Sequence, residues 1–203
     1  RYPLCVFITF EGPEGAGKST VIEKLALQLK GAGQEVVCSR EPGAGILGAV
    51  IRRVLLDGDD MPALSELFLF LADRANHVKT IVRPALTEGK IVLCDRFGDS
   101  TVVYQGIARG LDPEMLRKLN AIATENLVPD LTLLLDLPVE IGLARVTDSN
   151  RLDREPIEFH NAVRSGFLAE AAREPIRWKV IDASQSVEIV VEECWNQISP
   201  RLR

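Results

Sequence analysis

The chain has 203 residues, which is enough for one domain with one sizeable hydrophobic core and too few for two domains of ordinary size. Hydrophobic residues make up 46% and charged residues 26%, which excludes extended disorder and a disulfide scaffold. The formal charge of −5 argues against a protein that coats nucleic acid or a membrane, so an anionic ligand must be held locally.

Apolar runs of strand length alternate with stretches of helical period along the chain. The runs predict strands buried on both faces at residues 4–10, 35–39, 91–94, 131–135 and 178–181. Between them, apolar side chains recur at helical spacing, as in Val21, Leu25 and Leu29, and a further predicted helix places Leu67, Phe70, Leu71 and Arg74 on one face. Helix starts are marked by Asp112 before Pro113, and by Pro138. This alternation predicts an α/β fold with a parallel sheet covered on both faces.

A change of composition occurs near the end of the chain. Residues 147–156 carry two Asp, one Glu, two Arg and a Pro but only one aliphatic residue, Leu152, so we expect a mobile surface segment within a packed domain. The cysteines are scattered without a C-x-x-C pair, which predicts buried thiols in a reducing cytoplasm, at Cys5, Cys38, Cys94 and Cys194. The first apolar run is too short for a membrane span.

The clearest motif is a phosphate-binding loop at residues 12–19, G-P-E-G-A-G-K-S, which follows the first strand and opens the first helix. Its backbone N–H groups and the helix N-terminus attract phosphate oxygens. Lys18 can reach the outer phosphates, and Ser19 can ligate Mg²⁺. A guanine-nucleotide switch would also need an N/T-K-x-D motif, which the sequence lacks.

Charged side chains follow two other predicted strands. Asp95 is placed to organise Mg²⁺, and Arg96 to grip a second phosphate, because ligands bind at the carboxyl edge of a parallel sheet. Residues 40–43, R-E-P-G, reach the same edge, and Arg52 lies on the helix that follows. Arg53 points about 100° away from Arg52, so only one of them should face the site. Two arginine-bearing segments opposite one phosphate loop suggest a phosphorylated donor and a phosphorylated acceptor.

Taken in this order and spacing, the segments resemble the thymidylate kinase family over essentially the whole chain. The matching stretches are residues 10–19, 40–43, 69–77, 95–97, 99–101, 104–106, 129–136 and 181–184. The resemblance implies a P-loop nucleoside-monophosphate kinase fold, with a five-stranded parallel sheet flanked by helices, in one domain over residues 1–203. It also implies a short lid at about 146–157, a homodimer, and transfer of the γ-phosphoryl group of ATP to dTMP. No nucleic acid polymer and no membrane are expected as partners.

The resemblance also assigns roles to individual residues. It places ATP and Mg²⁺ on Gly12, Glu14, Gly15, Ala16, Gly17, Lys18, Ser19, Thr20, Asp95, Arg145 and Ala183. It places dTMP on Glu14, Glu41, Pro42, Arg52, Phe70, Arg74, Arg96, Thr101, Tyr104 and Gln105. Within that pocket, Phe70 would stack on thymine and Arg74 would donate to its O4. Tyr104 would lie against the sugar, and Glu14 would contact the 3′-OH.

Within the family that the chain resembles, one group carries a basic residue in the phosphate loop and the other supplies its catalytic arginine from the lid. Residues 13–16 have no basic residue, so the resemblance implies a catalytic arginine in the lid. Arg151 and Arg154 are the candidates, and Arg151 is preferred because Asp153 and Arg154 resemble a pairing at the base of the lid. This lid is poorer in arginine than is usual for its group. Two alternatives stay open: a P-loop kinase for a deoxynucleoside or another monophosphate, and a nucleotide-binding module without catalysis.

Overall fold

The computed structural model describes residues 6–202. The strands are β1 (Val6–Glu11), β2 (Val36–Arg40), β3 (Ile91–Asp95), β4 (Leu131–Asp136) and β5 (Trp178–Asp182). The α-helices are α1 (Lys18–Gly31), α2 (Gly45–Asp57), α3 (Ala63–His77), α4 (Arg83–Thr87), α5 (Gly98–Thr101), α6 (Pro113–Ala123), α7 (Val139–Ala144), α8 (Ile157–Arg173) and α9 (Val187–Ile198). Two π-helices, η1 (Val78–Val82) and η2 (Val102–Ala108), and one 3₁₀ helix, η3 (Ser199–Leu202), complete the described part.

All five strands predicted from the sequence are present and form one parallel sheet in the order β2-β3-β1-β4-β5. The prediction that all of them are buried on both faces holds for β1, β3 and β4 only. β2 and β5 are the edge strands, and each leaves part of its length exposed. Cys38 on β2 is therefore exposed, contrary to expectation, whereas Cys94 and Cys194 are buried; Cys5 lies outside the described residues.

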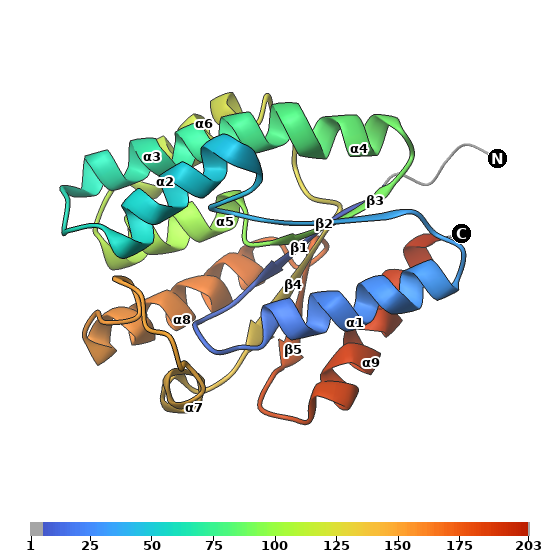
Figure 1. Cartoon of the computed structure of the whole chain (residues 1–203). Helices are drawn as coiled ribbons and strands as arrows, with labels where there is room; N and C mark the ends of the chain where they lie inside the picture. Colours follow the sequence, from blue (N-terminus) through green and yellow to red (C-terminus); the bar gives the residue numbers. More distant parts are fainter. Residues whose placement is uncertain (1–5, 203) are drawn as a thin grey trace.

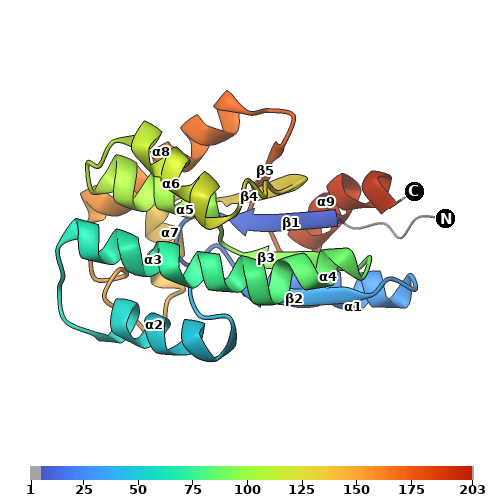
Figure 2. The same ribbon diagram turned by 90° about the horizontal axis from the view of Figure 1, so that it is seen from above.

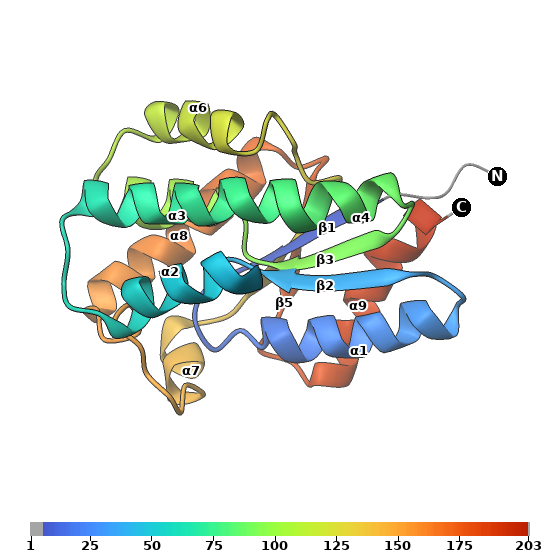
Figure 3. The ribbon, with the colours of Figure 1, turned by 45° about the horizontal axis from the view of Figure 1, so that its top comes forward.

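Helices cover both faces of the sheet, as the alternation predicted. In Figure 1, α1 and α9 lie below the strands, and α3 and α4 lie above them. The lower face is packed by apolar residues of α1 and α9 against alternate strand residues, such as Leu25 and Cys194 against Phe10 and Leu133. On the opposite face, α4 and η1 cover β3, while α8 and η2 cover β4 and β5. Figure 3 shows α2 lying alongside α3, outside this layer.

The strand register gathers polar residues at one end of the sheet. Asp95, the last residue of β3, pairs with Phe10 of β1 and with Arg40 of β2, so Glu11, Arg40 and Asp95 meet at the carboxyl edge. In Figure 2 the arrow of β1 points to the end of the molecule where α2, α5 and α7 lie. The loops that follow the strands therefore face these helices across a common space.

The connection between α7 and α8 is packed more closely than its composition suggests. Arg151 and Leu152 are only 6% and 7% exposed, and Leu152 packs with Ile51, Leu55 and Leu56 of α2. The expected surface segment is thus anchored at its centre by one aliphatic side chain.

Candidate functional site

The phosphate-binding loop is shaped by glycines that lie against the neighbouring backbone. Gly15 has a φ of +68°, and a Cβ there would stand 1.9 Å from the carbonyl oxygen of Gly142 on α7. The loop therefore needs glycine for its conformation and for its close contact with α7. Lys18 folds back over the loop, and its Nζ donates to the carbonyl oxygens of Gly12 at 3.2 Å and Pro13 at 3.0 Å. Burial, followed by repulsion from Arg96, lowers the pKa of Lys18.

Arg96 lies at the centre of the site, between the phosphate loop and η2. Its Nη2 donates to Glu14 Oε1 at 2.7 Å, and its Nη1 donates to the Gly12 carbonyl oxygen at 3.1 Å. Tyr104 adds a second bond to Glu14 Oε1 at 2.8 Å and places its ring 5.0 Å from the guanidinium. Although burial raises the pKa of Glu14, Arg96 and Lys18 outweigh it and lower that pKa to about 2. Glu14 is therefore ionised and orients Arg96.

The backbone of Arg96 adopts a left-handed conformation, with a φ of 67°. Two hydrogen bonds hold this turn: the Arg96 N–H donates to the Phe10 carbonyl oxygen at 2.9 Å, and the Phe97 N–H donates to Glu11 Oε1 at 2.8 Å. The other oxygen of Glu11 accepts from Ser100 Oγ at 2.6 Å. Glu11 is fully buried, and burial, reinforced by Asp99, raises its pKa to about 7. It is a structural clamp that the sequence reasoning did not single out.

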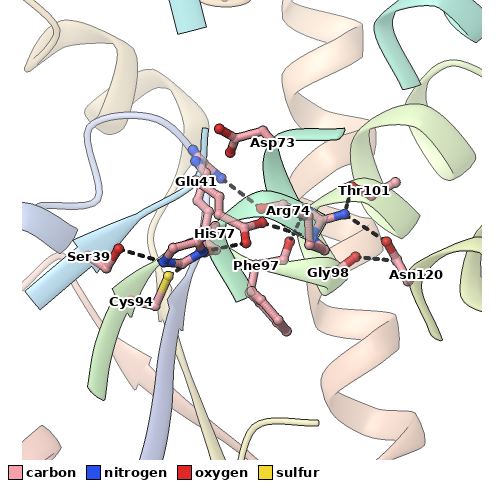
Figure 4. A network of polar contacts seen from close by, with 12 residues as sticks. Ser39, Glu41, Asp73, Arg74, His77, Cys94, Phe97, Gly98, Thr101 and Asn120 are labelled. Carbon is pink, nitrogen blue, oxygen red and sulfur yellow. Dashed lines mark hydrogen bonds and ion pairs between the residues drawn. The ribbon is translucent and has the colours of Figure 1, made fainter. Parts of the chain in front are cut away.

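A second polar network fixes Arg74 on α3, and Figure 4 shows Glu41 lying between Arg74 and His77. Glu41 accepts from Arg74 Nε at 2.8 Å and lies 2.7 Å from His77 Nδ1. The Nη1 group of Arg74 donates to Thr101 and Asn120 at 2.8 and 2.7 Å. Its Nη2 group donates to the Phe97 carbonyl oxygen at 3.1 Å. Arg74 is only 1% exposed, so its position is set before any ligand arrives.

Arg52 on α2 differs from these two arginines because its only described bond is to a backbone carbonyl, Pro42 O, at 2.8 Å. Burial lowers its pKa, and so do the positive charges of Arg40 and Arg96. Arg53 is exposed and lies outside the cleft. The loop between β2 and α2 is bonded to Asp73 on α3. The backbone N–H of Gly43 donates to both carboxylate oxygens of Asp73, each at 3.3 Å.

These groups line one cleft of about 370 Å³. Most of the residues named from the sequence are among its walls: Glu14, Gly15, Ala16, Gly17, Lys18, Ser19, Thr20, Glu41, Pro42, Arg52, Phe70, Arg74, Asp95, Arg96, Thr101, Tyr104 and Gln105. Leu56, Phe97, Ser100, Asn150 and Leu152, which the sequence reasoning did not assign to the site, also line it.

Five of the named residues do not line the cleft: Gly12, Arg145, Arg151, Arg154 and Ala183. Arg145 and Ala183 nevertheless lie together, since Arg145 Nη1 donates to the Ala183 carbonyl oxygen at 3.2 Å. Arg151 is buried against Glu66, and Arg154 is exposed beside a smaller hollow that Asp59 and Asp60 border. Neither of the two arginines expected to belong to a lid therefore lines the cleft with the phosphate loop.

Asn120 and Glu66 support the site from outside the motifs. Asn120 on α6 accepts from Arg74 and donates to the Gly98 carbonyl oxygen at 2.8 Å, and Glu66 on α3 accepts from Gln105 at 2.9 Å. The only sequence signal for Glu66 was a carboxylate next to the apolar face of its helix. No sequence signal pointed to Asn120, because its contacts with Arg74 and Gly98 depend on how α6 packs against the rest of the fold.

One pair of oxygen ligands is suited to a divalent cation. Ser19 Oγ donates to Asp95 Oδ2 at 3.0 Å, where α1 begins and β3 ends. A hydroxyl and a carboxylate are hard donors of the kind that Mg²⁺ prefers, and Mg²⁺ usually takes few protein ligands because phosphates and water complete its shell. Within residues 6–202, no group of three or more His, Cys, Asp or Glu is arranged to hold a metal by itself. In the same range, no helix combines the length and apolarity needed to cross a membrane.

Comparisons with known proteins agree in one family. A profile described as thymidylate kinase matches residues 10–194. A thymidylate kinase of Desulfovibrio desulfuricans is 51% identical over 210 residues, with 98% of this chain and 97% of that protein covered. One from a Synechococcus strain is 49% identical over 197 residues, covering 97% and 96%. The crystal structure of thymidylate kinase from Ehrlichia chaffeensis superimposes with a TM-score of 0.82 at 34% identity, covering 97% of this chain and 100% of that one.

Proposed function

This chain belongs to the thymidylate kinase family of ATP-dependent nucleoside-monophosphate kinases, and we propose that its cleft transfers the γ-phosphoryl group of ATP to dTMP, giving ADP and dTDP. One observation supports this reaction above the others. The phosphate loop with Lys18 lines the same cleft as Phe70 and Arg74, and Arg96, which is bonded to the loop, lines it as well. That arrangement suits two phosphorylated ligands placed end to end.

The acceptor pocket has one donor left for a base. A guanidinium carries five N–H groups, and four of those on Arg74 are engaged by Glu41, Thr101, Asn120 and Phe97. We assign the remaining N–H of Nη2 to O4 of thymine. Phe70 stacks on the ring, and the other contacts of the nucleoside come from Glu14, Thr101, Tyr104 and Gln105, which line the same walls.

The acceptor phosphate belongs beside Arg52 and Arg96, near residues 41 and 42. Arg52 has no acidic partner among its described contacts, and repulsion from Arg40 and Arg96 lowers its pKa. A phosphate group at this point relieves the repulsion. The acceptor oxygen is already anionic, so the reaction needs no general base. It needs in-line placement of two anions that repel each other.

The donor side is the phosphate loop, residues 12–20, with Arg145 and Ala183 beside adenine. Ser19 and Asp95 fit a Mg²⁺ ion, which when bound would neutralise charge on the outer phosphates of ATP. Lys18 uses two of its three N–H groups on the carbonyls of Gly12 and Pro13, and the third is left for the phosphate charge. The lid, about residues 146–157 of the single 1–203 domain, supplies a further cation from Arg151 or Arg154.

The decisive test is a panel of phosphate acceptors. Purified protein with ATP and Mg²⁺ should release ADP fastest with dTMP, more slowly with dUMP and not measurably with thymidine. Equal or faster turnover of thymidine or dUMP would contradict the assignment and favour one of the other kinases considered above. Absence of turnover with every acceptor, despite binding of ATP, would favour a nucleotide-binding module.

We further propose that the enzyme is a homodimer in the cytoplasm. Large apolar side chains on the outer sides of α2 and α3 are exposed at spacings of four residues: Ile46, Val50, Val54, Leu64 and Phe68. Two copies of this chain could bury these faces against each other. Sedimentation should give a dimer that Phe68→Glu converts to a monomer, and a monomeric parent protein would refute the interface. The free thiols of Cys38, Cys94 and Cys194 fit a reducing compartment.

A further inference from the structure

Glu66 on α3 is a buried carboxylate that does not line the cleft yet joins two parts of the site. It is 1% exposed. Its Oε1 accepts from Gln105 Nε2 at 2.9 Å, and its Oε2 accepts from Arg151 Nη2. Although burial raises the pKa of Glu66, the bonds from Arg151 and Gln105 outweigh it and lower that pKa. One ionised carboxylate therefore holds a side chain of the nucleobase pocket and a side chain of the lid.

Arg151 is attached to α2 as well as to Glu66. Its Nε donates to the Leu55 carbonyl oxygen at 3.0 Å, and its backbone N–H donates to the Leu56 carbonyl oxygen at 3.0 Å. On its two sides in the chain, Asn150 and Leu152 line the cleft. Arg151 is thus the point at which the lid is fixed, and its neighbours are the part of the lid that meets the ligand.

A second arginine continues the same connection. Arg109, the residue that follows η2, approaches both oxygens of Glu66 at 3.4 Å, and its Nη2 lies 2.7 Å from Glu155 Oε1 in the lid. η2 also carries Gln105 and Tyr104, which line the cleft. Glu66 and Arg109 therefore connect Gln105, in the proposed nucleobase pocket, to both ends of the lid segment 151–155.

We propose that Glu66 is a positioning residue that couples occupation of the nucleobase pocket to the placement of the lid. The proposal rests on the proposed roles of Gln105 and of residues 146–157. A base that fixes Gln105 fixes Glu66 Oε1, and the other oxygen then holds Arg151 and the lid in one arrangement. Arg151 is accordingly the lid anchor. Exposed Arg154, which has no ion-pair partner within residues 6–202, is left to supply the cation for the transferred phosphate.

The coupling can be measured at equilibrium without turnover. The affinity for AMPPNP with Mg²⁺ is determined by calorimetry with and without saturating dTMP, in the parent protein and in Glu66→Gln. The parent should bind AMPPNP at least about fivefold more tightly when dTMP is present, as is usual for coupled sites. In Glu66→Gln this ratio should fall to below about twofold, because Gln105 and Arg151 bond different oxygens of Glu66 and the amide replaces one of these oxygens with a donor.

Glu170→Gln is the matched control. Glu170 on α8 is also buried, at 5% exposure, and also accepts from an arginine, Arg117, at 2.5 Å, but it contacts neither the lid nor the cleft. It should keep the ratio of the parent. If Glu66→Gln does not fold, Arg151→Lys replaces it, since lysine keeps the charge but cannot bond Leu55 and Glu66 together. The double variant Glu66→Gln/Arg151→Lys should lower the ratio no further than either single change.

The proposal would be overturned by no coupling in the parent protein, by an unchanged ratio in folded Glu66→Gln, or by an equal loss in Glu170→Gln. Failure of the proposed reaction would appear differently, as absence of dTMP phosphorylation by the parent protein. A preserved ratio in Arg151→Lys with kcat lowered about a hundredfold would also overturn it, because Arg151 would then be the catalytic cation.

Discussion

Two substitutions of Arg96 can distinguish the contribution of its guanidinium to catalysis from the cost of its strained backbone to stability. Its φ of 67° lies in the left-handed region, where a residue with a Cβ costs roughly 1–2 kcal/mol relative to the right-handed form. Arg96→Ala and Arg96→Gly remove the same guanidinium and the same bonds to Glu14 and Gly12. Only Ala keeps the Cβ, so a difference in stability between the variants reports the backbone alone.

The expected difference follows from two opposing effects. Glycine removes the strain of roughly 1–2 kcal/mol but loses roughly 0.4–1 kcal/mol because its unfolded chain is more flexible. Arg96→Gly should therefore be more stable than Arg96→Ala by about 0.5–1 kcal/mol. For a chain of this size, that corresponds to a Tm higher by about 1–4 °C. The hydrogen bonds from the Arg96 and Phe97 N–H groups remain available in both variants.

Scanning calorimetry gives the two Tm values, and coupled ADP release gives kcat. Both variants should lose about 10²–10³ in kcat, because each lacks the same positioned cation at the developing charge. An Arg96→Ala protein that unfolds at the same temperature as Arg96→Gly, or higher, would refute the argument from strain. A kcat that differs more than about threefold between them would show that the backbone, and not the lost guanidinium, controls the rate.

Three further predictions test other parts of the site. Phe70→Ala should raise KM for dTMP by about tenfold or more and leave KM for ATP within threefold, in steady-state kinetics with each substrate varied; an equal rise in both would contradict the stacking role. Arg154→Ala should lower kcat by about 10²–10³ in the same assay. The control is Arg53→Ala, which changes an exposed arginine outside the cleft and should leave kcat within twofold. Equal effects of the two changes would show that Arg154 has no catalytic role. The pKa of Glu11 is raised from 4.5 to about 7, so its contribution to stability is complete below pH 4.5 and is lost as pH rises through 7. Denaturant unfolding should show the stability of the parent relative to Glu11→Gln falling by roughly 3 kcal/mol between pH 4.5 and 8, and a difference independent of pH would contradict this.

The sheet and the phosphate loop could be predicted from the sequence because local signals determine both. A run such as residues 131–135 is too apolar to lie anywhere but in the core, and the spacing of Gly12, Gly17 and Lys18 suits one conformation. The family resemblance is confirmed by the comparisons, as are the fold and the kinase activity that it implied. The identity of the edge strands could not be predicted in this way, because it depends on the order of the strands in the sheet, and the sequences of the strands do not determine that order.

The supporting residues could not be found in the same way. Gln105 and Tyr104 lie on η2, a π-helix from Val102 to Ala108 in which each hydrogen bond spans five residues instead of the four of an α-helix, and side-chain spacing in the sequence does not reveal that difference. Arg151 belongs to a segment whose charges predicted exposure. It is buried because Leu152 beside it packs against α2 and because Glu66 offers a partner, and both contacts come from distant parts of the chain.

The net charge of −5 and two polyanionic substrates are compatible because most of the inward-facing arginines have a carboxylate partner. Glu14 holds Arg96, Glu41 holds Arg74, and Glu66 holds Arg151. Each partner fixes a guanidinium before the substrate binds, so less ordering remains for the moment of binding or reaction. Arg52 differs from these three, since its only described bond is to a backbone carbonyl, and it is repelled by Arg40, which also lines the cleft, and by Arg96. Arg52 therefore adds positive charge without a described carboxylate partner to the side of the cleft opposite the phosphate loop, and a dianionic acceptor phosphate is a ligand that it would attract strongly.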